Sequence, residues 1–189
     1  MSGVAGKRSA DALARAARVR LLALDVDGTM TDGTIFIGPG QEAMKGFSVR
    51  DGFGLALLRE AGLKIAVVTA RQSSIVATRA AELRFDAIEQ GVADKALALA
   101  EIASRYGLEP AQAAFMGDDW PDLGAMSIAG LAAAPADAAP EVAAAAHWVS
   151  SVAAGRGAVR EFAQWLLQAR GEFDALLARH RAPAPGRAR

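Results

Sequence analysis

The stretch LLALDVDGTMTDG, residues 21–33, decides how the rest of the chain is interpreted. Its apolar run, Leu21 to Leu24, is bounded by turn residues, a pattern typical of a strand buried on both faces. Asp25 and Asp27 follow the run, and residues two apart in a strand point to the same side. Because ligands of open parallel sheets bind beyond the carboxyl ends of the strands, we expect these two carboxylates at the floor and rim of a site.

Two carboxylates on one side repel each other, and burial strengthens that repulsion. A Mg²⁺ held by Asp25 would compensate the negative charge of the two carboxylates. A proton on Asp27 would neutralise one of them. One charged nucleophile beside one general acid is what phosphoryl transfer through an aspartyl-phosphate requires. Gly28 lets the chain turn sharply, so that backbone N–H groups can face a phosphate. The competing interpretation is an acidic surface turn after a strand.

Composition and charge narrow the class of protein. The 189 residues, 52% of them hydrophobic, fit one domain with a full core. Lys+Arg and Asp+Glu both number 21, which argues against a nucleic-acid partner. The absence of cysteine excludes disulfides and cysteine–zinc sites. Without a secretory pattern at the start, or an apolar run of roughly 18 residues, we expect a soluble cytoplasmic protein with no membrane partner.

Strand and helix patterns alternate along the chain, which predicts an α/β fold with a doubly wound, Rossmann-like parallel sheet. The expected strands are residues 20–26, 64–69, 86–89, 113–117, 131–134 and 148–149. The expected helices are residues 9–18, 54–61, 73–83, 94–106, 122–129, 140–146 and 158–179, the last one bent near Gly171. We expect one domain over residues 9–180, between a disordered start at 1–8 and a mobile tail at 181–189.

A β-hairpin is predicted within residues 34–49. The β-prone segment 34–37 precedes the turn Gly-Pro-Gly at 38–40, and residues 44–49 can return as the second strand.

Further candidate site residues follow predicted strands or open predicted helices. Thr69 could donate a hydrogen bond to a phosphate oxygen or cap the next helix. Lys95 would add positive charge beside a phosphate, although a lone Lys on a helix is usually solvated. Asp118 and Asp119, after the apolar run AAFM, suit a hard cation, and N-capping by Asp119 is the alternative. Arg156, between two glycines, could reach an anion or lie in an exposed loop.

The order of these signals resembles the motif order of the haloacid dehalogenase (HAD) superfamily of phosphotransferases, over nearly the whole chain. That resemblance implies the HAD fold and Mg²⁺ as cofactor. It implies that Asp25 is the nucleophile and a metal ligand, that Asp27 is the general acid/base and gives its carbonyl to the metal, and that Asp118 is a metal ligand. Asp119 would orient a metal-bound water. The residues expected to bind the phosphoryl group are Gly28, Thr29, Thr69, Ala70 and Lys95.

Four segments narrow the resemblance further: DVDGTMTDG, VRDG at 49–52, GVADK at 91–95 and GRGAVRE at 155–161. Together they resemble the 3-deoxy-D-manno-octulosonate 8-phosphate (KDO 8-phosphate) phosphatases. This implies a phosphorylated sugar acid as substrate, in lipopolysaccharide precursor synthesis. It also implies a small flap at about 34–49 in place of a separate cap domain, and a homotetramer in which a neighbouring subunit covers the open site.

By the same resemblance, Arg156 would contact the substrate or close the site, and Arg50 and Arg71 would bind the sugar acid or its phosphate. One departure is Ala70, where the family usually has Gly between Thr and Arg. Because Ala cannot easily take a positive φ, either the turn does not need one or Arg71 is displaced. The role of Asp122 stays open.

Three other functions compete. The nearest is a phosphatase for nonulosonate 9-phosphates, against which VRDG with GRGAVRE favours the octulosonate. A phospho-acceptor receiver domain also combines carboxylates, a Thr and a Lys, but nucleophile and acid on one strand favour turnover. The third is a non-catalytic module that helps a sugar nucleotidyltransferase to oligomerise, and the complete set of motif residues argues against it.

Overall fold

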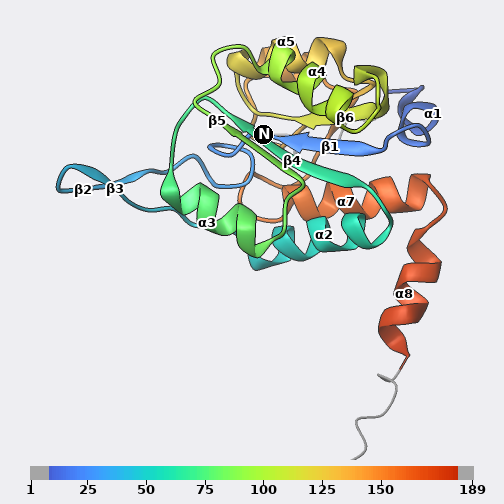
Figure 1. The fold of residues 1–189 in the computed structure, drawn as a ribbon. Coiled ribbons are helices and arrows are strands. Elements are labelled where there is room, and N and C mark those ends of the chain that lie inside the picture. The colour runs from blue at the N-terminus through green and yellow to red at the C-terminus, as the bar shows by residue number, and fades with distance from the viewer. Residues whose placement is uncertain (1–8, 183–189) are drawn as a thin grey trace, which may run out of the picture.

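A six-stranded parallel sheet forms the centre of the computed structural model, which describes residues 9–182 (Figure 1). The strand order is β5-β4-β1-β6-β7-β8. The strands are β1 (Leu21–Leu24), β4 (Lys64–Thr69), β5 (Ala87–Gln90), β6 (Ala113–Met116), β7 (Leu131–Ala134) and β8 (Trp148–Val149). Every neighbouring pair is parallel, which confirms the predicted doubly wound α/β fold.

Strand β1 lies where the chain changes direction across the sheet. After β1, the chain adds β4 and β5 on one side of it, and then crosses to add β6, β7 and β8 on the other side. The carboxyl ends of β1 and β6 therefore flank the topological switch point, where open α/β sheets bind ligands. In the register of this pair, Leu24 lies beside Met116.

Helices cover both faces of the sheet (Figure 1). Side chains of β1 alternate between the faces, with Leu22 and Leu24 in one buried cluster and Leu21 and Ala23 in the other. The helices that contribute to the first cluster are α1 (Ala12–Ala16), α2 (Val49–Glu60), α3 (Ser74–Glu82), α7 (Ala158–Ala169) and α8 (Phe173–Arg181). Those that contribute to the second are α4 (Lys95–Arg105), α5 (Leu123–Ile128) and α6 (Pro140–Ala145).

The hairpin exists, but its predicted return strand at 44–49 is wrong. Strand β2 (Phe36–Gly38) pairs antiparallel with β3 (Gln41–Met44), so the second strand ends where it was expected to begin. Residue Val49 already opens α2, which was expected only from residue 54. The reason is Ser48, whose hydroxyl caps the helix by accepting a hydrogen bond from the backbone N–H of Asp51.

The predicted helix at 158–179 is two helices. Gly171 takes a φ of +71° between α7 and α8, a left-handed conformation that ends the first helix. Helix α8 continues to Arg181, so that residue does not belong to a tail. The predictions for residues 1–8 and 183–189 lie outside the described part of the chain. Within residues 9–182, the helices are too short or too polar to span a bilayer.

Candidate active site

A cavity of about 180 Å³ opens at the carboxyl ends of β1, β4 and β6, beside the switch point. The residues that line it are Asp25, Asp27, Thr69, Ala70, Arg71, Lys95, Asp118, Asp119, Pro121 and Asp122. The fold thus brings together side chains that the sequence separates by almost a hundred residues.

Lys95 holds two carboxylates at the floor of this cavity. Its Nζ lies 2.7 Å from Oδ1 of Asp25 and 2.6 Å from Oδ1 of Asp122. All three residues are almost fully buried. Burial lowers the pKa of Lys95, but the charges of the two carboxylates outweigh that effect and raise this pKa above its ordinary value. Lys95 is therefore a cation fixed beside the predicted nucleophile.

A third carboxylate completes an acidic cluster. Oxygen atoms of Asp25, Asp118 and Asp122 all lie within 4.8 Å of one another. Burial raises the pKa of Asp25 to about 6, against the opposing charge of Lys95. Burial and the nearby charge of Asp25 raise the pKa of Asp118 to about 7. One lysine does not balance three carboxylates, and crowded carboxylate oxygens are the donor set that a hard divalent cation prefers. The residues therefore fit Mg²⁺.

Two glycines allow the loops after β1 and β6 to meet. Gly28 has a φ of +89°, and a Cβ there would lie 2.1 Å from Oδ2 of Asp118. At Gly117 a Cβ would lie 2.3 Å from Cγ of Asp122. Since real Cβ atoms do not approach so closely, any larger residue at either position would displace a carboxylate of the cluster.

Asp122, whose role the sequence left open, contacts both Lys95 and the backbone of its own loop. It ends the short 3-10 helix η2 (Trp120–Asp122). While Oδ1 binds Lys95, Oδ2 accepts hydrogen bonds from the backbone N–H groups of Asp118 at 2.9 Å and Asp119 at 3.2 Å. The third acidic residue of GDDWPD, residues 117–122, was the signal in the sequence that could have identified Asp122 as a site residue.

Asp27 faces the base of the hairpin. Its Oδ1 forms an ion pair with Lys45, whose side chain is fully buried, and Nε of Arg71 lies 3.6 Å from its Oδ2. Lys45 also lies 2.8 Å from Oε1 of Glu42 on β3. Neither Lys45 nor Glu42 was predicted from the sequence, because only the fold brings the end of β3 against the residues after β1.

The other predicted residues take different places. The Oγ1 of Thr29 donates to Oδ1 of Asp118 at 2.9 Å, so Thr29, like Gly28, adjoins the cluster without lining the cavity. Asp119 is exposed and its Oδ1 accepts a hydrogen bond from the N–H of Trp120, the capping role considered as the alternative. Among residues 9–182, Arg84 is the only residue other than glycine that has a positive φ. The backbone at Ala70 therefore has no positive φ. The turn before Arg71 therefore does not need a glycine.

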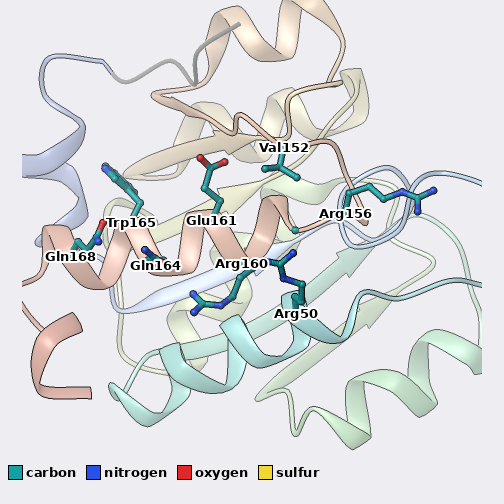
Figure 2. A pocket seen from close by; sticks show the side chains of 9 residues that line it. Arg50, Val152, Arg156, Arg160, Glu161, Gln164, Trp165 and Gln168 are labelled. Atoms are coloured by element: carbon teal, nitrogen blue, oxygen red, sulfur yellow. The ribbon is translucent and has the colours of Figure 1, made fainter. Parts of the chain in front are cut away.

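Arg50 and Arg156 do not line this cavity. Both line a second cavity along α7 (Figure 2). Nη2 of Arg156 lies 3.4 Å from Oδ2 of Asp32, at the end of the acidic stretch.

A parallel α/β sheet with an acidic cluster and a lysine at its switch point is typical of HAD-like hydrolases, and the family model of haloacid dehalogenase-like hydrolases matches residues 85–162. The *Escherichia coli* K12 KDO 8-phosphate phosphatase is 39% identical over 169 residues, which cover 89% of this chain and 90% of the relative. The chain belongs to the KDO 8-phosphate phosphatase family.

Solved structures agree with this assignment. The *Moraxella catarrhalis* KDO 8-phosphate phosphatase, crystallised with magnesium, phosphate and KDO, superposes with a TM-score of 0.87 at 36% identity, covering 90% of this chain and 98% of the other. The cobalt-bound *Haemophilus influenzae* enzyme gives a TM-score of 0.83 at 35% identity, covering 85% and 94%.

Proposed function

We propose that this protein is a Mg²⁺-dependent phosphatase that hydrolyses KDO 8-phosphate to KDO and phosphate, in the cytoplasm, as a step of lipopolysaccharide precursor synthesis. The observation that carries the proposal is the cluster of Asp25, Asp118 and Asp122 at the switch point, in which Lys95 contacts Asp25 and Asp122. Family membership and the ligands of the *Moraxella* structure support the substrate and the metal.

The reaction divides into two displacements at phosphorus. A carboxylate oxygen of Asp25 attacks phosphorus, and the bond from phosphorus to the sugar oxygen breaks as Asp27 protonates that oxygen. Asp27 then takes a proton from a water that attacks the aspartyl-phosphate, which frees phosphate and restores Asp25. Lys95, Thr69 and backbone N–H groups near Gly28 stabilise the phosphoryl oxygens.

Mg²⁺ would be held by the carboxylates of Asp25 and Asp118 and the carbonyl of Asp27, with Asp122 beside them. When bound, it supplies positive charge that offsets both the carboxylates and the phosphate. Asp119 lies at the exposed edge, where orienting a water is its proposed role. Arg71, half-exposed at the cavity wall, is the proposed contact for the sugar acid.

A homotetramer is part of the proposal. The hairpin exposes Phe36, Ile37 and Met44, with 47%, 73% and 57% of their surface accessible, which is unusual for apolar side chains clustered on one element. A neighbouring subunit seated on this flap would exclude water from the open cavity. In such an assembly Arg156 and Arg50 could serve a substrate, as the family resemblance implies.

The test is phosphate release with Mg²⁺ from a panel that includes KDO 8-phosphate and a nonulosonate 9-phosphate. We expect KDO 8-phosphate to give the highest kcat/KM, and Asp25→Asn to abolish turnover while retaining the native circular dichroism spectrum. Asp174→Asn, on α8, is the matched control and should keep full activity. Wild-type turnover by folded Asp25→Asn would refute the mechanism, and preference for the nonulosonate ester would refute the substrate.

A further inference from the structure

A second cavity, of about 340 Å³, lies along α7 and shares no lining residue with the cavity of Asp25 (Figure 2). Its basic end contains Arg50 and Arg160, with Arg156 at the rim, and its wall along α7 contains Gln164, Trp165 and Gln168. The volume falls in the range of small-molecule sites.

The close packing of α2 and α7 brings two of these arginines together. A Cβ at Gly54 would lie 3.1 Å from Cα of Arg160, so the helices meet at a glycine. Arg50 precedes Gly54 by four residues and lies on the same side of α2. Figure 2 shows the side chains of Arg50 and Arg160 next to each other at the junction of the two helices. Burial and the charge of Arg50 lower the pKa of Arg160, against the attraction of Asp51.

Asp51 offsets only part of the positive charge at this end, because its carboxylate acts on both Arg50 and Arg160. Nη1 of Arg160 is buried without a hydrogen-bond partner. Glu161, the acid that lines the cavity, accepts hydrogen bonds from Ser150 and from the N–H and Oγ of Ser151, both at 2.8 Å. A buried donor without a partner costs about 1–3 kcal/mol, and an oxyanion would satisfy it.

The rest of the cavity is suited to a polar ring. Gln164 and Gln168 follow Arg160 at intervals of four residues, so their amides lie in line with the guanidinium along one side of α7. The half-buried ring of Trp165 stands in the same wall and packs against Trp148 and Phe162. Amides bind hydroxyl groups, and an aromatic face packs against the C–H groups of a ring.

We propose that this cavity binds a small molecule with a phosphate or carboxylate group, which Arg160 and Arg50 hold, and with a hydroxylated body that lies along Gln164, Gln168 and Trp165. Within one subunit this cavity shares no lining residue with the catalytic cavity. The proposal goes beyond the proposed function and does not depend on it.

The three tryptophans make the test selective. In protein labelled with 5-fluorotryptophan, each gives one fluorine resonance, assigned by single Trp→Phe substitutions. Trp165 reports on this cavity, and exposed Trp120 reports on the loop beside Asp119. Inorganic phosphate and KDO are titrated separately into the full chain. We expect at least one of them to shift the Trp165 resonance saturably, and the probe that does so identifies phosphate or carboxylate as the group bound.

The affinities of substituted proteins test where in the cavity the anionic group binds. Arg160→Met keeps the aliphatic stem but loses the charge, and we expect it to raise Kd about tenfold or more. Gln164→Glu, on a half-buried polar position, should weaken binding by repulsion without endangering the fold. Arg18→Met removes an exposed arginine elsewhere and should leave Kd unchanged.

Three results would overturn the proposal: no shift at Trp165 with either probe, a shift confined to Trp120, or equal affinity in wild type, Arg160→Met and Gln164→Glu. A failure of the proposed function is distinguishable, because it would appear as lost phosphate release while Trp165 still responds.

Discussion

Lys95 is the residue on which the charge balance of the acidic cluster depends. It contacts Asp25 and Asp122, while Asp118 is restrained by the hydroxyl of Thr29. Two buried carboxylates and one half-buried carboxylate beside one ammonium leave excess negative charge, which is useful for binding a cation and costly without one. The electrostatics of these few residues therefore predict how the metal-free protein responds to pH.

The stability of the metal-free protein should fall as pH rises from about 5 to about 8. The pKa values of Asp25 and Asp118, about 6 and about 7, lie above the ordinary 3.8, so the folded state binds more protons than the unfolded chain across this range. The stabilisation is complete at acidic pH and is lost as pH rises through the folded pKa values. Thermal unfolding in EDTA, measured at several pH values, tests this.

Mg²⁺ should reverse that trend, since it compensates the charges that proton loss creates and competes with the same protons. We expect the rise in Tm caused by Mg²⁺ to grow with pH. Asp118→Asn removes one titrating group, so its metal-free Tm should depend less on pH. A Tm in EDTA that increases steadily up to pH 8, about one unit above the higher folded pKa, would contradict the assignment.

Gly28→Ala should abolish most phosphatase activity. Its Cβ would overlap Oδ2 of Asp118 at 2.1 Å, so the carboxylate must move out of the cluster. The matched control is Gly62→Ala, at the end of α2. Gly62 has nearly the same φ, +87° against +89°, but nothing lies within 4 Å of the added methyl group. Both variants should lose about 1–2 kcal/mol of stability from backbone strain. If both kept wild-type kcat, contact with Asp118 would not matter.

At the scale of elements, the close packing of α2 against α7 shapes the second cavity, which residues of both helices line. Helix α2 starts at Val49 because Ser48 caps it, and Asp51 in its first turn accepts a hydrogen bond at 2.8 Å from the N–H of Arg160 on α7. Helix α2 thus stabilises the start of α7 through Asp51, and Gly54 sets the separation of the two helices.

Gly54→Ala should destabilise the protein by about 1–3 kcal/mol, because the methyl group would lie 3.1–3.2 Å from Arg160 and Ala163 and push the helices apart. Gly124→Ala, on α5, is the control: its methyl group would meet only an ordinary contact, Cβ of Ala96 at 3.6 Å. That variant should gain about 0.5–1 kcal/mol from helix propensity. Urea unfolding measures both, and equal changes would show that the crossing tolerates a methyl group.

At the scale of the whole molecule, the flap carries three exposed apolar side chains, those of Phe36, Ile37 and Met44. Ile37→Lys, at a side chain 73% accessible, should dissociate the proposed tetramer and reduce activity, because a buried lysine would lack a partner at the interface. Leu13→Lys, on α1 and 62% accessible, is the control and should change neither. Light scattering after size exclusion gives the mass; a wild-type monomer with full activity would refute the assembly.

The sequence by itself determined the parallel α/β sheet and the order of its strands' motifs. It also indicated Asp25, Asp27, Lys95, Asp118 and Asp119 as residues of one site, but left the role of Asp122 open. These follow from local patterns, since an apolar run followed by Asp-x-Asp-Gly specifies a strand end and its turn. The hairpin's return strand at 44–49 and the start of α2 were mispredicted, because a cap at Ser48 outweighed the β propensity of the segment before it.

Only the tertiary structure decided which side chains become partners. Lys95 meets Asp25 across 70 residues of sequence, Lys45 meets Asp27 through the hairpin, and Arg50 and Arg156 lie in a second cavity, apart from the first. Local patterns specify the end of each strand, whereas packing of the helices on the sheet fixes where those ends, and the charges on them, lie relative to one another.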